Sequence, residues 1–253
     1  MSDLAKRTWP EADELFTERS VVILPIGSTE PHGPHLPLDT DVTIAVAQSR
    51  RAARKLEAMK VAAVVLPPIS YGITHFTDGF AGGISLRPGT LWALLEDIVY
   101  SLEEQGIRRI VFSNGHLEPE HIEVLRGVPL DHAVLTKDRA QVLFPDNTRR
   151  RWAQTLGEEF ASGECHAGRY ESSIVLAADA EGVRTEELAR LPRKEIGLLK
   201  KMGEGVTSFL AAGADLAYCG EPARASAEEG EERIEKLAEM IVISAQEAWP
   251  ELF

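Results

Sequence analysis

Cysteines and long apolar stretches are both scarce in this chain of 253 residues. Cys165 and Cys219 are the only cysteines, which is too few for a disulfide scaffold and the wrong spacing for a cysteine-rich zinc site. No apolar run reaches the roughly 18 residues that a membrane-spanning helix needs, and no charged-then-apolar leader with a cleavage site opens the chain. We therefore expect a soluble, cytoplasmic protein.

An excess of positive charge is also absent. The formal net charge is -13, and because neither a basic run of any length nor an aromatic-basic stripe is present, we expect no nucleic acid and no membrane as partners. The local run Arg149–Arg151 is interpreted as a solvated helix face. With 44% hydrophobic residues, the chain can bury one substantial core and is short for two. We expect a single domain over residues 1–253.

Short apolar runs alternate with helical patterns along the chain, as in repeated strand-helix units. Strands are predicted at residues 20–26, 61–66 and 107–113, with a weaker candidate at 133–136, and helices at 42–59, 90–105, 148–161 and 227–248. This alternation predicts an α/β fold with a mostly parallel sheet covered by helices on both faces. Open sheets of this kind bind their ligands in the crevice at the carboxyl ends of the strands.

The segment Gly27–Asp41 follows the first predicted strand and concentrates acids and histidines among prolines and glycines. Glu30 and His32 are two residues apart, so an extended turn can aim both side chains at one point. Carboxylate oxygen and imidazole nitrogen together are typical ligands of divalent metals. Asp41 stands at the entrance of a predicted helix, where it either caps the helix or points into the crevice.

A second pair, His116 and Glu118, directly follows the strand predicted at 107–113. Because the carboxyl ends of parallel strands face one way, the two His/Glu pairs can converge although they are distant in sequence. The alternative for Glu118 is an acid in the first turn of a helix, with Pro119 at an early helical position. The joint arrangement, more than any one residue, indicates a metal centre.

Residues 165–173 form a third cluster, in which a turn of small residues leads into an apolar run. His166 is a candidate acid/base, because its ordinary pKa lies near neutrality and its small neighbours leave room for a substrate. The alternative is a surface or core histidine. A thiol nucleophile at Cys165 is disfavoured, since the side chains of adjacent residues seldom point at each other.

Together these clusters resemble the signatures of the creatininase (creatinine amidohydrolase) family. The matching segments are 24–41 with LP-x-GSTE-x-HGPHLPL-x-TD, 114–118 with NGH-x-E and 166–173 with HAG-x-x-ET/SS, and further segments at 71–75, 82–86 and 220–230. The resemblance therefore covers nearly the whole chain, in order. It implies a three-layer α/β/α sandwich and a homo-oligomer, with a hexamer favoured.

The same resemblance implies about two divalent metals per protomer, zinc and/or manganese, with iron as a further option. One metal would be held by Glu30, Asp41 and His116, and the other by His32, Asp41 and Glu118, with Asp41 as the bridge. A water activated by the metals would attack the substrate.

Two residues of the third cluster receive roles from the resemblance. His166 would protonate the departing nitrogen as a catalytic acid. Glu171 would act in catalysis by orienting the metal ligands, although it could itself be a ligand in members that lack the equivalent of Glu118.

The substrate is less well defined, because the chain departs from the family pattern at several positions. Leu117 stands where creatinine-hydrolysing members carry a tyrosine that can pack against a flat ring, and Pro31 and Pro119 also replace the usual residues. Arg169 stands at a position that is often held by an acid in the family. If it faces the pocket, it favours an anionic small molecule; the alternative is a solvated arginine at a helix entrance.

We therefore expect a metal-dependent amidohydrolase that acts on a cyclic amide or a formamide, with creatinine a poor substrate. The family also contains formamidopyrimidine-nucleotide deformylases, peptide-trimming enzymes of redox-cofactor maturation and hydrolases of oxidised inositols. One alternative is thus a non-amide carbonyl substrate such as a dehydro-inositol. The lesser alternative, a non-catalytic metal-binding protein, is disfavoured because the matched acids and His166 are intact.

Overall fold

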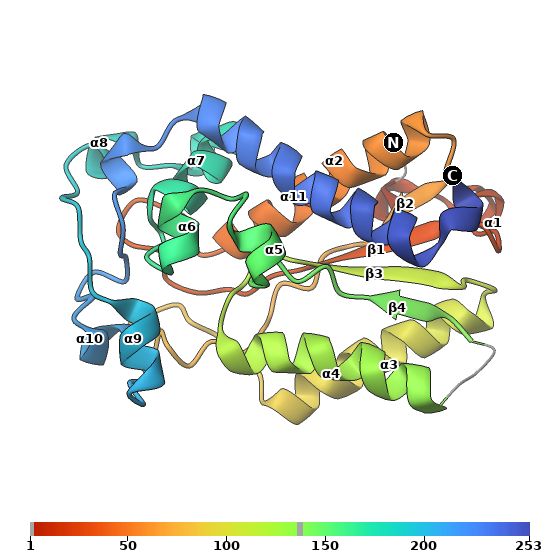
Figure 1. Ribbon diagram of the computed structural model, residues 1–253, viewed down its shortest axis with the longest axis horizontal. Helices are drawn as coiled ribbons and strands as arrows, with labels where there is room; N and C mark the ends of the chain where they lie inside the picture. The colour runs from red at the N-terminus through yellow and green to blue at the C-terminus, as the bar shows by residue number, and fades with distance from the viewer. Residues whose placement is uncertain (1–2, 136–138) are drawn as a thin grey trace.

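A computed structural model describes residues 3–135 and 139–253 and shows a sheet between two layers of helices (Figure 1). In this part of the chain four parallel strands are paired in the order β2-β1-β3-β4. They are β1 Val21–Ile26, β2 Ala63–Val65, β3 Arg109–Asn114 and β4 Gln141–Leu143. The predicted three-layer α/β/α fold is confirmed.

Successive side chains of each strand point to opposite faces of the sheet. Leu24 and Phe112 pack with apolar residues of α3 Pro88–Glu104 and α4 Pro119–Leu135 on one face. On the other face, Ile23 packs with α2 Thr40–Ala58 and α11 Ala227–Ala248. Because both faces are covered, β1 is apolar along its whole length and β3 has a buried apolar run at 110–112.

The other described elements are short. They are η1 Leu4–Lys6, α1 Trp9–Leu15, α5 Arg150–Ala153, α6 Glu158–Ser162, α7 Arg169–Ala178, η2 Ala180–Gly182, α8 Thr185–Leu188, α9 Leu198–Gly203, α10 Phe209–Ala212, η3 Pro222–Arg224 and η4 Pro250–Leu252. Elements α5 to α10 gather beyond the carboxyl edge of the sheet (Figure 1). No helix within the described residues is long and apolar enough to cross a membrane.

Two predicted elements were wrong. Residues 133–135 of the predicted strand 133–136 end helix α4, and residue 136 lies outside the described residues; the fourth strand is β4. The helix predicted at 148–161 is divided into α5 and α6. Gly157 lies between them with a φ of 101°, a left-handed conformation that interrupts a right-handed helix.

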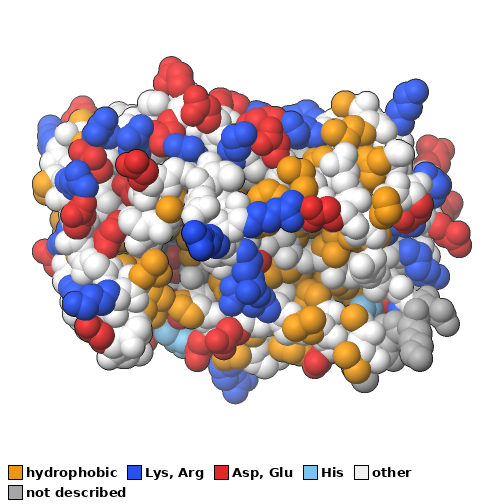
Figure 2. All heavy atoms as spheres, in the orientation of Figure 1, with side chains coloured by type: hydrophobic (Ala, Val, Ile, Leu, Met, Phe, Trp, Pro, Cys, Tyr) orange, Lys and Arg blue, Asp and Glu red, His pale blue; other side chains and the backbone are white. Residues whose placement is uncertain are grey.

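Charged side chains of both signs are interspersed on the face drawn in Figure 2. Several of them form ion pairs between the outer helices α2 and α11, such as Arg51 with Glu231 at 2.6 Å and Glu235 at 3.0 Å. Exposed pairs of this kind add little to stability. The free energy of folding therefore comes mainly from the two apolar layers on either side of the sheet.

The strand order reverses between β1 and β3, because β2 lies beyond one and β4 beyond the other. A crevice opens at such a switch point, outside the carboxyl ends of the strands. Gly27 and Gly115 follow these two strands, and a Cβ on them would lie 2.6 Å from Val42 N and 2.2 Å from Asp41 O, respectively. The two glycines thus allow the first turn of α2 to enter the crevice.

Candidate metal centre

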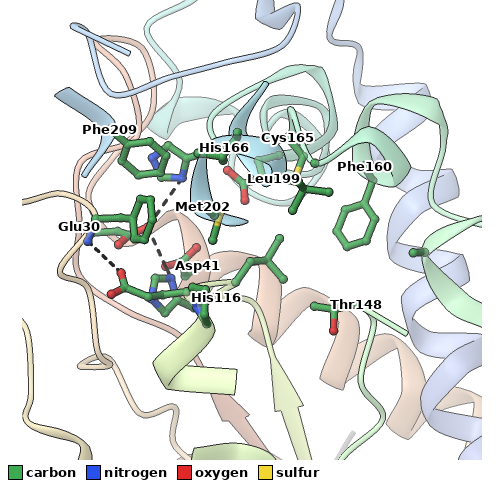
Figure 3. Close-up of a pocket in the computed structure, with 18 of the residues that line it drawn as sticks. Glu30, Asp41, His116, Thr148, Phe160, Cys165, His166, Leu199, Met202 and Phe209 are labelled. Carbon is green, nitrogen blue, oxygen red and sulfur yellow. Dashed lines mark hydrogen bonds and ion pairs between the residues drawn. The ribbon is translucent and has the colours of Figure 1, made fainter. Parts of the chain in front are cut away.

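Six buried side chains converge at this switch point, and Figure 3 labels Glu30, Asp41, His116 and His166 among them. They come from the loop after β1, the start of α2, the loop after β3 and the start of α7: Glu30, His32, Asp41, His116, His166 and Glu171. Within the described residues, these side chains form three groups in which one nitrogen or oxygen atom of each residue lies within 4.8 Å of those of the other two. The groups are Glu30-Asp41-His116, His32-Asp41-Glu171 and Glu30-His32-His166.

Asp41 lies between two imidazoles and belongs to two of these groups. Its Oδ2 is 2.9 Å from His116 Nδ1, and its Oδ1 is 3.2 Å from His32 Nε2. Glu30 Oε1 is 3.4 Å from His116 Nδ1. This arrangement, with one carboxylate facing two donor sets, suits a ligand shared by two cations. Asp41 does not cap α2, because the N-cap position belongs to Asp39.

Each of the three imidazoles is oriented by a main-chain carbonyl. A carbonyl only accepts hydrogen bonds, so the nitrogen next to it carries the proton and the other nitrogen presents its lone pair. The bonds are His32 Nδ1 to Glu30 O at 3.0 Å, His116 Nε2 to Ile73 O at 2.6 Å and His166 Nε2 to Pro31 O at 3.1 Å. The three lone pairs consequently face carboxylates, an arrangement that a cation between them stabilises.

The electrostatics of the centre also call for a cation. Burial lowers the pKa of His32, but the carboxylates of Asp41, Glu171 and Glu30 outweigh it and raise that pKa to about 10. Burial raises the pKa of Glu171 to about 8 despite the nearby His32. Among the described residues, His32 Nε2 and Asp41 Oδ2 are buried without a hydrogen-bond partner. The donor set therefore fits divalent metals, which supply positive charge without a proton.

Glu118 lies outside all three groups of the described residues. Its two carboxylate oxygens accept hydrogen bonds from the main-chain N–H groups of His75 and Phe76, at 2.8 and 3.1 Å. Glu171 occupies the position expected for Glu118: its Oε2 is 3.5 Å from His32 Nε2. The structure thus brings together the other expected residues, and it places Glu171 in one group with His32.

Two residues that sequence reasoning missed support the His116 loop. Asn114 Oδ1 accepts hydrogen bonds from His116 N at 3.2 Å and from His121 Nε2 at 3.1 Å, and its amide donates to His116 O. Asn114 belongs to the matched NGH segment, so a signal was present. His121 gave no such signal, because a histidine inside a helix is usually a packing or surface residue.

A cavity of about 190 Å³ opens onto the centre. Apart from Glu118 and Thr148, its remaining wall is apolar and includes Phe76 after β2 and Leu117 after β3. Leu199 and Met202 of α9 and Phe209 of α10 complete it (Figure 3). No lysine or arginine in the described part of the chain lines it.

Arg169 does not face this cavity, so the reason for expecting an anionic substrate is removed. It lines a separate, polar cavity, and its Nε donates to Glu229 at 2.5 Å. The first turn of α7 turns Glu171 toward the centre and Arg169 toward α11. The side chains of residues two apart on a helix point in different directions.

Two further residues of the third cluster line the cavity. The ring of His166 stacks on Phe209 with centroids 4.1 Å apart, and burial, together with the charge of His32, lowers the pKa of His166 to about 3. Burial raises the pKa of the Cys165 thiol well above its usual range. A thiolate nucleophile is therefore unfavourable at Cys165.

Comparison with known proteins identifies the chain's relatives. The model of the Creatininase family (creatinine amidohydrolase) matches residues 5–244. The chain belongs to the creatininase family. The mycofactocin precursor peptide peptidase of Mycolicibacterium smegmatis is 34% identical over 222 residues, which cover 86% of this chain and 81% of the relative.

Two further creatininase-family proteins extend this comparison. The creatinine amidohydrolase of Pseudomonas putida is 31% identical over 195 residues, 67% of this chain and 69% of that protein. A solved manganese form of creatininase shares the fold with a TM-score of 0.74 at 24% identity, over 99% of this chain and 100% of that one. The relatives named here are hydrolases, and this chain is a creatininase-family hydrolase.

Proposed function

We propose that this chain is a divalent-metal-dependent hydrolase that cleaves an amide C–N bond. The observation that carries the proposal is the convergence of three imidazole lone pairs on three buried carboxylates at the switch point of the sheet. The expected cofactor is about two metals per chain, zinc and/or manganese, as the donor set and the manganese form of a related creatininase support.

Glu30, Asp41 and His116 would hold one metal, and His32, Asp41 and Glu171 the other. Glu171 replaces Glu118 in this assignment because Glu171 Oε2 lies 3.5 Å from His32 Nε2 and forms a group with His32 and Asp41, whereas Glu118 belongs to none of the groups found among the described residues. When bound, the metal pair would lower the pKa of a water and polarise the substrate carbonyl.

The residues around the centre would move the proton and exclude bulk water. His166 Nδ1 carries a lone pair, because Nε2 donates to Pro31 O. It would take up the proton released by the attacking water and pass it to the departing nitrogen, which leaves as an amine. Phe209, stacked on this ring, would keep the imidazole in place and water away.

The apolar cavity favours a substrate with an uncharged, apolar group beside the amide. A short apolar peptide is one candidate, and it is supported by the peptidase of Mycolicibacterium smegmatis at 34% identity. Cyclic amides and formamides, the classes expected from the sequence, remain the other candidates. A dehydro-inositol is a poorer fit, because its many hydroxyl groups need polar partners, and outside the proposed metal ligands and His166 only Glu118 and Thr148 offer polar side chains in the described wall.

The decisive experiment is a substrate screen of zinc- and manganese-loaded protein, read by mass spectrometry in water enriched in ¹⁸O. We expect an amide-bearing apolar compound to yield an amine and a carboxylate that carries one ¹⁸O. Metal-loaded protein that hydrolyses dehydro-inositols and no amide would contradict the proposed bond. Light scattering on the same sample measures whether the chain forms the homo-oligomer, a hexamer, favoured by family resemblance.

Creatinine is expected to be a poor substrate. Leu117 lines the cavity and lacks the flat face of an aromatic ring, whose contact contributes about 0.5–1.5 kcal/mol beyond burial. Steady-state kinetics of the fully metallated protein check this. A creatinine kcat/KM of roughly 10⁴ M⁻¹s⁻¹ or more, within the usual enzymatic range, would refute it.

A further inference from the structure

The segment Ile73–Phe76, in the loop that follows β2, contacts two side chains of the centre, His116 and Glu30, and the neighbouring Glu118. Ile73 O accepts from His116 Nε2, and the N–H groups of His75 and Phe76 donate to Glu118. Between them, the hydroxyl of Thr74 donates to Glu30 Oε2. One stretch of four residues therefore holds groups that belong to the loops after both β1 and β3.

Thr74 is the one residue of this segment that uses its side chain for the contact. Thr74 and Glu30 are 1% and 2% exposed, so water does not compete for the bond. An ionised carboxylate only accepts hydrogen bonds, and the bonding proton therefore comes from the Thr74 hydroxyl. A hydrogen bond to a charged group in such a dry position is stronger than one between neutral groups.

The bond determines which oxygen of Glu30 faces the centre. With Oε2 directed at Thr74, the free oxygen Oε1 lies 3.4 Å from His116 Nδ1, 3.7 Å from His32 Nε2 and 3.8 Å from His166 Nδ1. Rotation of the carboxylate would place Oε1 elsewhere and break the bond. Glu30 is thus restrained to present a single oxygen to the imidazoles.

A second hydroxyl supports the first. Thr77 Oγ1 lies 2.9 Å from Thr74 Oγ1 and 3.1 Å from Thr74 O. Because the proton of Thr74 points at Glu30, the oxygen of Thr74 is left to accept from Thr77. Chains of this kind polarise each bond, but Thr77 is one hydrogen bond further from Glu30.

We propose that Thr74 is a positioning residue of the metal centre, whose hydroxyl holds Glu30 in the orientation that binds metal together with Asp41 and His116. The inference rests on the proposed metal centre. Removing such a partner of a metal ligand typically lowers metal affinity about 10–100-fold. The loss should concern the Glu30 site more than the site formed by His32 and Glu171.

The test is a zinc titration of the metal-free full chain in competition with a chromophoric chelator. Thr74→Val keeps the shape of the side chain and removes the hydroxyl, so we expect one of two zinc ions to bind about 10–100-fold more weakly. Thr74→Ser keeps the hydroxyl and should bind both ions within about 3-fold of the unsubstituted protein. Thr77→Val is the matched control and should also stay within about 3-fold.

Each outcome separates this inference from the proposed function. If the unsubstituted protein and Thr74→Val both bind two zinc ions tightly, the role of Thr74 is overturned and the proposed metal centre stands. Equal losses in Thr74→Val and Thr74→Ser would overturn it too, because packing would then be the cause. If circular dichroism shows that Thr74→Val is unfolded, Thr74→Ala and Thr74→Ser, which differ only by the hydroxyl, provide the same comparison. Unsubstituted protein that binds no zinc would overturn the metal centre and this inference with it.

Discussion

Glu171 and Glu118 show how single side chains decide the composition of the centre. Both are buried acids in sequence motifs that carry a histidine, Glu118 with His116 and Glu171 with His166, but their oxygens meet different partners. Glu171 Oε2 accepts from Ala167 N at 2.7 Å and lies 3.5 Å from His32 Nε2, in one group with His32 and Asp41. Each oxygen of Glu118 accepts a main-chain hydrogen bond.

The two acids should respond differently to the same substitution. Glu171→Gln is expected to lower the zinc content from about two to about one per chain, because an amide is a much weaker ligand than a carboxylate. Glu118→Gln is the matched control and should keep both ions. Elemental analysis after identical dialysis measures the difference. Loss of zinc from Glu118→Gln with full retention by Glu171→Gln would restore the assignment made from the sequence.

His166 is expected to act in proton transfer more than in metal binding. His166→Ala should retain its metals while kcat falls by roughly two to four orders of magnitude, the usual effect of losing a general acid/base. Turnover of whichever amide the screen identifies and the zinc content of the same preparation are measured together. Since His166 also forms a group with Glu30 and His32, loss of a metal would instead make it a ligand.

At the scale of helices, the contact between α7 and α11 places Glu171. Gly230 of α11 lies against α7 so closely that a Cβ on it would be 1.9 Å from Ser173 O. Ser173 is two residues from Glu171 on the same helix. The small size of Gly230 therefore sets how far α7 lies from α11, and with it where Glu171 meets His32.

Gly230→Ala should destabilise the protein although alanine is the better helix former. The gain in helix propensity is about 1 kcal/mol, whereas overpacking typically costs about 1–3 kcal/mol, and a contact of 1.9 Å with backbone cannot be relieved by a side chain. Urea unfolding should show a net loss of up to about 2 kcal/mol in the free energy of unfolding. The control is Gly89→Ala in α3, where nothing lies within 4 Å of the added Cβ. Equal stability of the two variants would contradict this account.

At the scale of the whole molecule, metal binding should contribute to folding, since three carboxylates are buried together at the centre. When the free metal concentration is 100 times the Kd of one site, binding at that site adds about 2.7 kcal/mol to the free energy of unfolding. For a chain of this size, 1 kcal/mol corresponds to roughly 2–4 °C in Tm. Removing the metals with a chelator should thus lower Tm by roughly 5–11 °C per site. Calorimetry with and without chelator measures it, and an unchanged Tm after verified metal removal would argue against a buried metal centre.

Much of the fold follows from local patterns. The strands predicted at 20–26 and 107–113 match β1 and β3 within two residues, because each contains a short apolar run, 21–26 and 110–112, that is followed by a glycine-containing turn. Helix 227–248 matches α11, since its apolar residues recur at helical spacing. The predictions failed at 133–136 and 148–161, where a helix end and a left-handed glycine decide the structure and periodicity carries little information.

The amino-acid sequence by itself determined the fold class, the family and the loops that carry the candidate ligands, because chemistry-bearing residues follow strands whose carboxyl ends must meet. The tertiary structure alone decided which acid lies beside His32, that Arg169 faces another cavity, and that Thr74 holds Glu30. These outcomes depend on side-chain direction, which is set by packing between segments distant in sequence: α7 against α11 for Glu171 and Arg169, and the segment Ile73–Phe76 against the loops after β1 and β3 for Thr74.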